Sequence, residues 1–340
     1  MEGGSEMEDL VRMNFWKGKR VFVTGSTGVI GLNLINRLVS YGAEVTALVR
    51  DWVPQATHLG GWLSSDSDVN IVRGELEDYF FIMRVLSEYE VKYVFHLGAQ
   101  TIVQIGNSSP VTTFKANIEG TWNLLEAIRV LDGYSHSFEA VCVASSDKAY
   151  GSSKTLPYTE DMPLCGEHPY DVSKSCTDLI AQSYGKTYGL PISISRMGNI
   201  YGPGDLNFSR IIPGTIKSIL EKKRPEIRSD GTPMREYFYV DDAVNAYLSL
   251  AQHTKLMDRS GEAFNFSSGE KLSVIQVVRN IIEMMDAGIE PEIMNKGKYE
   301  IQDQYLSIRK AEDVLGWHPE FPLKRGLPVT IDWYRSVLCD

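Results

Sequence analysis

Short apolar runs alternate with longer segments of helical periodicity from residue 18 to residue 197. Mainly apolar and β-branched runs predict six buried strands, at residues 19–25, 43–49, 69–74, 91–98, 138–145 and 191–197. Between them, apolar side chains recur at the spacing of a helix face, at residues 29–42, 76–89, 111–131 and 169–189. Such alternation is typical of a parallel sheet covered on both faces. The pattern therefore predicts an α/β fold, a Rossmann-type doubly wound parallel sheet.

The alternation weakens after residue 200, where turn-forming stretches such as YGPGD, RSDGTPM and SSGEK occur. We expect a dinucleotide-binding Rossmann domain over residues 14–190, with return segments near 236–266. Residues 191–340 are expected to form mainly a smaller, mixed α/β substrate-binding domain, interleaved with the first, that covers the carboxyl edge of the sheet. Residues 1–13 are acidic and contain glycine, so we expect a flexible tail there.

The composition narrows the possible partners. The chain has 340 residues, 43% of them hydrophobic, and a formal net charge of −10. Because no basic run is present, we expect neither nucleic acid nor a membrane surface as partner. No apolar stretch approaches the ~18 residues of a membrane span. The cysteines form no CxxC pair, so we expect reduced thiols in a cytoplasmic protein and no metal site; they are Cys142, Cys165, Cys176 and Cys339.

A glycine loop, VTGSTGVIG, joins the first predicted strand to the first predicted helix. Its glycines, Gly25, Gly28 and Gly31, are three residues apart. Glycines there let the backbone turn tightly and approach a pyrophosphate, which then lies at the helix N-terminus. Because the triplet stands on a strand–turn–helix at the start of an alternating chain, it predicts a dinucleotide site.

Residues that follow the second and third predicted strands could contact the ribose and the adenine of a bound dinucleotide. Arg50 and Asp51 follow the second strand. An acid at this place can hold the ribose 2′-hydroxyl of NAD, whereas an arginine can hold the 2′-phosphate of NADP. We favour NAD and keep NADP as the alternative. Glu75 follows the third strand and is either a contact to the adenine edge or a solvated acid.

Tyr170 and Lys174 stand four residues apart in YDVSK, so they share one face of the predicted helix. A lysine cation beside a phenol favours the phenolate, so Tyr170 can act as a base near neutral pH. The strand before this helix ends in Ser145 and Ser146, at the edge where open α/β sheets bind ligands. Asp147 and Lys148 follow directly, as either a solvated ion pair or an acid and a base of the site.

Taken together, these segments resemble an extended short-chain dehydrogenase/reductase. The motifs are TGSTGVIG, HLGAQ, NIEGT, the serine strand, YDVSK, RMGNIYGPGD, GTPMREYFYVDDA, FNFSSGEKLSV and LGWHPEFPLKRGL. They span nearly the whole chain after residue 14 in the family's order. Within this family, NFWKGKRVFVTG, SDK and LGWHP are most similar to nucleoside-diphosphate-sugar 4,6-dehydratases, in particular those acting on CDP-glucose.

The resemblance implies roles for the acid and base pair. In sugar 4,6-dehydratases, the tyrosine takes the C4 hydroxyl proton while hydride passes to the nicotinamide. The resulting 4-ketone acidifies the C5 hydrogen, a base removes it, an acid protonates the departing C6 hydroxyl, and the hydride returns to C6. By this resemblance, Asp147 is the acid and Lys148 the base, while Ser146, Tyr170 and Lys174 serve the oxidation. A lysine base must be neutral, so burial and Lys174 would have to lower its pKa.

The resemblance also implies binding residues. Cofactor contacts are expected from Gly25, Thr27, Gly28, Val29, Ile30, Gly31, Arg50, Asp51, Glu75, Leu76, Leu97, Ala99, Tyr170 and Lys174. Contacts to the sugar nucleotide are expected from Gln100, Thr101, Asn199, Arg210 and Arg235, the last through the fit of a guanidinium to phosphate. His96 is expected to be a packed structural residue.

The chain departs from the CDP-glucose pattern in three places. It lacks an Asn-Arg-Glu-Trp insertion after SDK, has GPGDL for GGGDW, and has QYLSIR where a His-Tyr stretch is common. The nucleotide base and the hexose of the substrate therefore stay open.

The sequence also leaves two alternative functions. A 4-epimerase is the alternative enzyme, against which the Asp147–Lys148 pair argues, and a non-catalytic cofactor-binding protein is a remote alternative. A homodimer, or a dimer of dimers, is expected through the helices containing NIEGTWNLLEAI and KSCTDLIAQSYGKTY.

Overall fold

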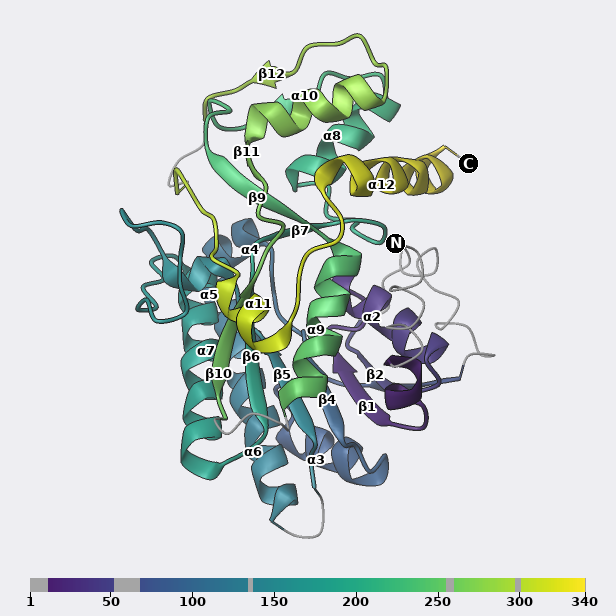
Figure 1. Ribbon diagram of the computed structural model, residues 1–340, viewed down its shortest axis with the longest axis vertical. Helices are drawn as coiled ribbons and strands as arrows, with labels where there is room; N and C mark the ends of the chain where they lie inside the picture. Colours follow the sequence, from purple (N-terminus) through teal and green to yellow (C-terminus); the bar gives the residue numbers. More distant parts are fainter. Residues whose placement is uncertain (1–11, 52–67, 134–136, 255–259, 297–300, 340) are drawn as a thin grey trace.

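A seven-stranded parallel sheet forms the larger part of the protein (Figure 1). The structure, a computed structural model, describes residues 12–51, 68–133, 137–254, 260–296 and 301–339. The sheet order is β10-β6-β5-β4-β1-β2-β3. Its strands are β1 (Arg20–Thr24), β2 (Glu44–Val49), β3 (Val69–Arg73), β4 (Tyr93–His96), β5 (Ala140–Ala144), β6 (Ile192–Met197) and β10 (Glu262–Phe266). All pairs are parallel, which confirms the predicted Rossmann-type doubly wound sheet.

Helices cover both faces of this sheet because alternate strand residues point to opposite sides. Val21 and Val23 of β1 pack in the core beneath α2 and α9, whereas Phe22 packs in the core beneath α3, α6 and α7. The helices are α2 (Val29–Ser40), α3 (Tyr79–Glu88), α6 (Gly120–Asp132), α7 (Pro169–Tyr188) and α9 (Val240–Thr254). The chain reverses direction across the sheet between β1 and β4, the crevice where such folds bind ligands.

A smaller lobe of mixed structure stands beyond the carboxyl ends of the strands (Figure 1). It begins directly after β6 with β7 (Asn199–Tyr201), which pairs with β9 (Met234–Tyr239). The remaining elements are α8 (Ile211–Leu220), β8 (Glu226–Ile227), β11 (Lys271–Ser273), α10 (Val274–Met284), β12 (Glu292–Ile293) and α12 (Leu323–Leu338). A separate apolar core, with Tyr201, Ile216 and Leu327 among its buried members, holds this lobe together.

The chain crosses between the two parts more than once. After β9 it returns as α9, which packs on the large sheet, and as β10, which pairs with β6 at the sheet edge. It then re-enters the small lobe through β11 and packs α11 (Arg309–Leu315) against β10 and α9. Both parts therefore contain segments that are far apart in sequence.

Three local features add to the predicted elements. A short helix, α4 (Val103–Ser108), precedes α5 (Pro110–Phe114). The predicted helix over 111–131 is helical throughout, but its residues Lys115–Glu119 form a π-helical segment, η3. Of the predicted tail, residues 1–11 lie outside the described part, and residues 12–16 are helical. Among the described helices, none has the length and apolarity to cross a membrane.

Candidate active site

The glycine loop turns between β1 and α2 with a geometry that side chains would block. Gly25 has φ +67°, and a Cβ on it would lie 2.6 Å from the carbonyl carbon of Leu97. A Cβ on Gly31 would lie 2.2 Å from the carbonyl oxygen of Gly25. Gly28 is exposed at the start of α2, where no side chain caps the helix. The first amides of α2 are thus open to an anion such as a pyrophosphate.

Buried hydrogen bonds hold this loop from below. Ser26 donates to the carbonyl oxygen of Leu48 on β2. Thr24 Oγ1 lies 2.9 Å from His96 Nδ1 and accepts a 2.9 Å hydrogen bond from the Gly98 amide. The other ring nitrogen of His96 lies 3.0 Å from Thr121 Oγ1. Burial lowers the pKa of His96 to about 3, so the ring is neutral and structural, as expected.

The residues expected around the rest of the dinucleotide differ in exposure. Thr27, Val29 and Ile30 are partly exposed at the start of α2, as are Leu97 and Ala99 after β4. Leu76 is buried, and Glu75 is exposed. At the end of β2, Arg50 Nε donates to Asp51 Oδ2 at 2.6 Å, and both side chains are more than half exposed. The side chains of Arg50 and Asp51 thus pair with each other. Their predicted contacts to the ribose of a dinucleotide stay predictions.

The end of β5 places four polar residues in sequence. Ser145 Oγ is buried without a partner within the described residues. Ser146 Oγ donates to Asp147 Oδ1 at 3.0 Å and accepts from the Lys148 amide at 3.2 Å, which starts the 3₁₀ turn η4 (Asp147–Tyr150). Asp147 is 4% exposed, whereas the side chain of Lys148 is 25% exposed. Lys148 Nζ lies 3.6 Å from Asp147 Oδ1, so the two form an ion pair in which the acid is buried and the lysine is partly exposed.

Helix α7 brings Tyr170 and Lys174 to the same edge. Pro169 occupies the first turn of α7, and both side chains are buried on its inner face. Lys174 Nζ donates to the carbonyl oxygen of Ala144 at 2.8 Å. Burial lowers the pKa of Lys174 to about 8, and the nearby carboxylate of Asp178 opposes that shift. The helix and the end of β5 thus form one polar site.

The protonation of Tyr170 differs from the expectation of a phenol that ionises near neutral pH. Burial raises its pKa to about 12, and the carboxylates of Asp147 and Asp171 act in the same direction. Arg210 and the hydroxyl of Ser146 lower it in part. The groups that shift the pKa of Tyr170 thus include Arg210 and Ser146 but not the expected Lys174, and burial outweighs them, so that Tyr170 carries its proton at neutral pH. Positive charge brought beside the phenol by a bound ligand would favour its ionisation.

The residues expected to contact the substrate differ in their exposure and in the hydrogen bonds that they make. Arg210, at the start of α8, bonds Asp205 at 3.1 Å and lies close enough to Tyr170 to influence its pKa. Asn199 donates to the Glu236 carbonyl oxygen at 3.3 Å. Gln100 bonds the backbone of Ile102. Thr101 is exposed in the same loop.

The described hydrogen bonds of the Arg235 guanidinium all go to backbone carbonyl oxygens. Its Nη1 donates to the carbonyl oxygens of Met234 and Gln302 at 2.8 and 2.9 Å, and its Nη2 donates to that of Ile301. A guanidinium has five N–H groups, and only those that make none of these described bonds could donate to a diphosphate. Its predicted contact to phosphate stays a prediction.

Two buried residues of the small lobe join the site although the sequence did not single them out. Gln304 Oε1 accepts from Lys148 Nζ at 3.4 Å. Glu236 is 4% exposed, its Oε2 accepts from the Leu306 amide at 2.8 Å, and burial raises its pKa. Asp147 contributes to that shift, so the two carboxylates are neighbours. REYF contains an acid beside the predicted Arg235, which was the available signal for Glu236.

Comparison with known proteins relates this arrangement to sugar-nucleotide enzymes. Residues 22–330 match the family described as GDP-mannose 4,6 dehydratase. The chain is 30% identical to the dTDP-glucose 4,6-dehydratase of Streptomyces antibioticus, over 93% of this chain and 92% of that protein. It is 28% identical to the CDP-glucose 4,6-dehydratase of Salmonella typhimurium, over 96% of this chain and 93% of that protein.

The structure of this chain is similar to solved structures of a 4-epimerase and of a 4,6-dehydratase. The UDP-glucose 4-epimerase of Thermotoga maritima, with UDP-glucose, superposes with a TM-score of 0.83 at 27% identity, covering 94% of this chain and 99% of that one. The dTDP-glucose 4,6-dehydratase of Streptomyces venezuelae, with NAD bound, superposes with a TM-score of 0.80 at 26% identity, covering 93% and 97%.

Proposed function

Because the chain belongs to the GDP-mannose 4,6 dehydratase family, we propose that it is a nucleoside-diphosphate-sugar 4,6-dehydratase that works with NAD. One observation carries the proposal: Asp147 and Lys148 pair at 3.6 Å directly after β5, beside the buried Tyr170 and Lys174. Oxidation at C4 needs only the tyrosine, the lysine, a serine hydroxyl and the nicotinamide. Loss of water across C5 and C6 needs a further acid and base, which this pair can supply.

In the proposed oxidation, Tyr170 acts as the phenolate, which the positive charge of a bound oxidised nicotinamide would favour, and accepts the proton of the C4 hydroxyl as hydride leaves C4. Lys174 stands behind it, fixed on the Ala144 carbonyl oxygen, and the Ser146 hydroxyl can bond the same sugar oxygen. When bound, NAD takes up the hydride and later returns it to C6. Arg210 assists by favouring the phenolate form of Tyr170.

In the proposed elimination, the 4-ketone acidifies the C5 hydrogen and Lys148 removes it as a proton. Asp147 gives a proton to the C6 oxygen, so that water departs and a C5–C6 double bond forms. The step requires Asp147 in its acid form and Lys148 in its neutral form. Gln304, which accepts from Lys148 Nζ at 3.4 Å, can orient the amine toward C5.

The dinucleotide is proposed to lie over the glycine loop. The uncapped start of α2 and the space left by Gly25 and Gly31 fit a pyrophosphate. NAD is favoured because the similar dehydratase of Streptomyces venezuelae was solved with NAD, while the Arg50–Asp51 pair keeps NADP as the alternative. Denatured protein should release NAD(H) or NADP(H), or one of them should raise the melting temperature. If neither occurs, the cofactor proposal fails.

We propose only the class of the substrate, a nucleoside-diphosphate hexose, and name neither its nucleotide base nor its hexose. Relatives named for dTDP-glucose and for CDP-glucose cover the chain to similar extents. The deciding experiment is incubation of the purified protein with CDP-, GDP-, UDP- and TDP-hexoses, followed by product analysis. A 4-keto-6-deoxy sugar from one of them identifies the reaction and the substrate together. A C4 epimer as the sole product would replace the dehydratase proposal.

A 4-epimerase is the second candidate, because an epimerase structure superposes closely on this chain. An epimerase eliminates nothing, so a buried acid beside a lysine at this place would have no task in it. A cofactor-binding protein without turnover is the remote third candidate. It would not require the buried pair of Tyr170 and Lys174, both of which are present.

We further propose that two copies pair through α6 and α7. Trp122 of α6 and Leu179 of α7 are 43% and 55% exposed, although each is a large apolar side chain. A two-fold contact would bury the same patch on both subunits. Light scattering at micromolar concentration should give twice the mass of the chain or a multiple of it. A monomer would contradict the proposal.

A further inference from the structure

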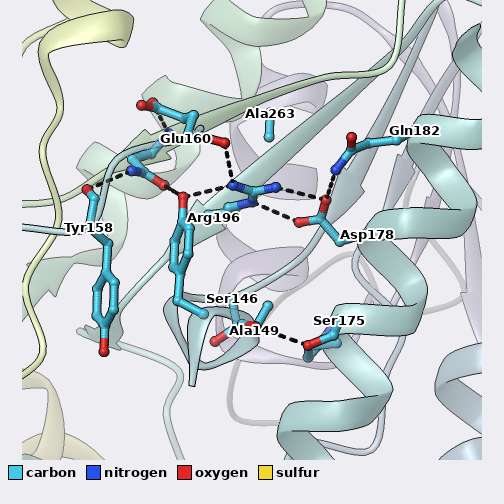
Figure 2. A network of polar contacts seen from close by, with 12 residues as sticks. Ser146, Ala149, Tyr158, Glu160, Ser175, Asp178, Gln182, Arg196 and Ala263 are labelled. Atoms are coloured by element: carbon cyan, nitrogen blue, oxygen red, sulfur yellow. Dashed lines mark hydrogen bonds and ion pairs between the residues drawn. The ribbon is translucent and has the colours of Figure 1, made fainter. Parts of the chain in front are cut away.

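Figure 2 shows a polar network centred on Arg196. Arg196 is on β6 and only 2% exposed. Its Nε and Nη2 bond the two carboxylate oxygens of Asp178 at 2.8 and 3.0 Å. On the other side, its Nη1 donates to the Tyr150 hydroxyl at 2.7 Å and to the Glu160 carbonyl oxygen at 3.2 Å. One guanidinium thus joins a strand, a helix and a turn.

The helix side of this network continues the catalytic face of α7. Asp178 comes four residues after Lys174 and eight after Tyr170, so the three side chains follow one stripe of the helix. Gln182, a further turn along, donates to Asp178 Oδ1 at 2.7 Å. Both carboxylate oxygens of Asp178 are therefore committed, and its bidentate contact with Arg196 sets the position of α7 on β6.

The turn side of the network ends at Tyr150, the last residue of η4. Its hydroxyl accepts from Arg196 and donates to Asn265 Oδ1 at 2.8 Å. Its ring stacks on Tyr158 with centroids 4.8 Å apart and planes within 5°. The ring is thus held by stacking and by the guanidinium, whose Cζ lies 4.8 Å from the ring centroid, while the hydroxyl is the atom that hydrogen-bonds Arg196.

A second contact links the same two segments. Ser175 of α7 donates to the carbonyl oxygen of Ala149 in η4 at 3.0 Å (Figure 2). A buried ion pair is weak support for stability alone, since well-packed apolar residues often replace one without loss. An arginine that makes four hydrogen bonds to a helix and a turn instead fits a requirement for defined geometry.

We propose that Arg196 is a positioning residue, which fixes the turn that carries Asp147 and Lys148 relative to the helix that carries Tyr170 and Lys174. This inference rests on the proposed function. One bound hexose must present C4 to the helix, and C5 and C6 to the turn. The distance between the two groups of residues therefore has to match the sugar. Small displacements of a reacting group cost rate steeply.

Tyr150→Phe tests the proposal because it removes the hydroxyl that hydrogen-bonds Arg196 and Asn265, and leaves the ring with its stacking and guanidinium contacts. The matched control is Tyr247→Phe, since Tyr247 is also buried and its hydroxyl accepts from Ser195 of the same strand at 2.7 Å. With Tyr150→Phe, we expect 4-keto-6-deoxy product and deuterium entry at C5 to slow by roughly 10- to 100-fold. Reduced cofactor in a single turnover should stay within about threefold of the wild type, because the helix residues are intact.

A second measurement keeps the inference testable without any substrate. Hydrogen exchange of the amides of residues 148–151 should accelerate in Tyr150→Phe and not in Tyr247→Phe, at equal distance from each variant's melting temperature. Unchanged exchange would overturn the proposal, as would equal slowing of oxidation and elimination. If the wild type makes no 4-keto-6-deoxy sugar from any substrate, the proposed function fails, and the exchange experiment alone decides whether Arg196 holds the turn.

Discussion

Lys174 Nζ on α7 lies 2.8 Å from the carbonyl oxygen of Ala144, the last residue of β5. The bond ties the helix that carries Tyr170 to the strand whose end carries Asp147. Lys174 is buried away from water, and this burial lowers its pKa to about 8. The charge of this side chain thus changes close to physiological pH.

Stability should depend on pH through Lys174. Below pH 8 the lysine is charged in both the folded and the unfolded chain, so the full cost of burying the charge is present. Between pH 8 and the ordinary value of 10.5, the folded chain has lost a proton that the unfolded chain keeps. The free energy of unfolding of the wild type, relative to Lys174→Met, should therefore rise by on the order of 3 kcal/mol across this window.

Urea unfolding at several pH values from 7 to 10.5 measures this difference. Lys186→Met is the matched control, because Lys186 is exposed on the same helix. Its difference from the wild type should stay constant with pH. A constant difference for Lys174→Met as well would show that the buried amine does not titrate there.

Asp147→Asn and Lys148→Met should separate the two halves of the proposed reaction. Losing a positioned proton transfer costs about 10²- to 10⁴-fold in rate. Formation of 4-keto-6-deoxy product should fall by that factor, while reduced cofactor still forms in a single turnover. Tyr170→Phe should instead suppress the reduced cofactor itself.

Solvent deuterium gives an independent measure of the same division. It should enter C5 with the wild type and slow sharply in Lys148→Met. If the pair variants lose cofactor reduction as completely as Tyr170→Phe, the division of roles is wrong. If they keep full turnover, Asp147 and Lys148 form only a structural ion pair.

Arg210→Met should move the pH dependence of cofactor reduction upward. Arg210 is the strongest influence that lowers the pKa of Tyr170, so its removal makes the phenol harder to ionise. We expect a roughly 10-fold slower reduction at pH 7, the equivalent of one pKa unit, recovered in part at pH 9. Arg309→Met is the control, because Arg309 is 85% exposed and pairs only with Asp313 among the described residues. A uniform loss at every pH would mean that Arg210 acts on binding alone.

Gly31→Ala should damage the dinucleotide site and the fold together. The added Cβ would meet the Gly25 carbonyl oxygen at 2.2 Å, so the loop or α2 must shift. We expect a loss of about 1–3 kcal/mol in the free energy of unfolding and little remaining cofactor. Gly133→Ala is the control, since its φ of −76° suits alanine and its nearest contact is 3.8 Å away. Normal cofactor retention in Gly31→Ala would contradict the placement of the pyrophosphate.

Local patterns were enough to predict six of the seven strands of the large sheet, whereas β10 was expected only as part of a return segment near residues 236–266. The run VFVTG and its five successors are apolar over each strand, and the helices between them have a clear period, so order and type followed without tertiary information. The six residues of α4 are too few to show a period, and the sequence did not predict them. The π-helical turn in η3 likewise leaves no mark on the apolar spacing.

The parts of the site that sequence reasoning missed are contacts between distant segments. Arg235 gave no sign that it would bond carbonyl oxygens 66 and 67 residues away. Arg196 is the one charged residue in the predicted strand PISISRM, but the sequence analysis assigned it no role, because its partner Asp178 lies on another element. Asp178 could have been found, because it continues the Tyr170 and Lys174 stripe by one more helical turn.

The return of α9 and β10 to the large sheet means that the protein has no simple cut point. A chain ending near residue 201 would keep the glycine loop and the polar edge of β5 but would lose the strand that pairs with β6. Its new edge would expose unpaired backbone groups, and the face under α9 would be uncovered, which is a setting for aggregation. The large sheet and the small lobe therefore depend on each other for folding, and a chimera that joined two relatives near residue 201 would have to restore the pairing of β10 with β6 and the packing of α9.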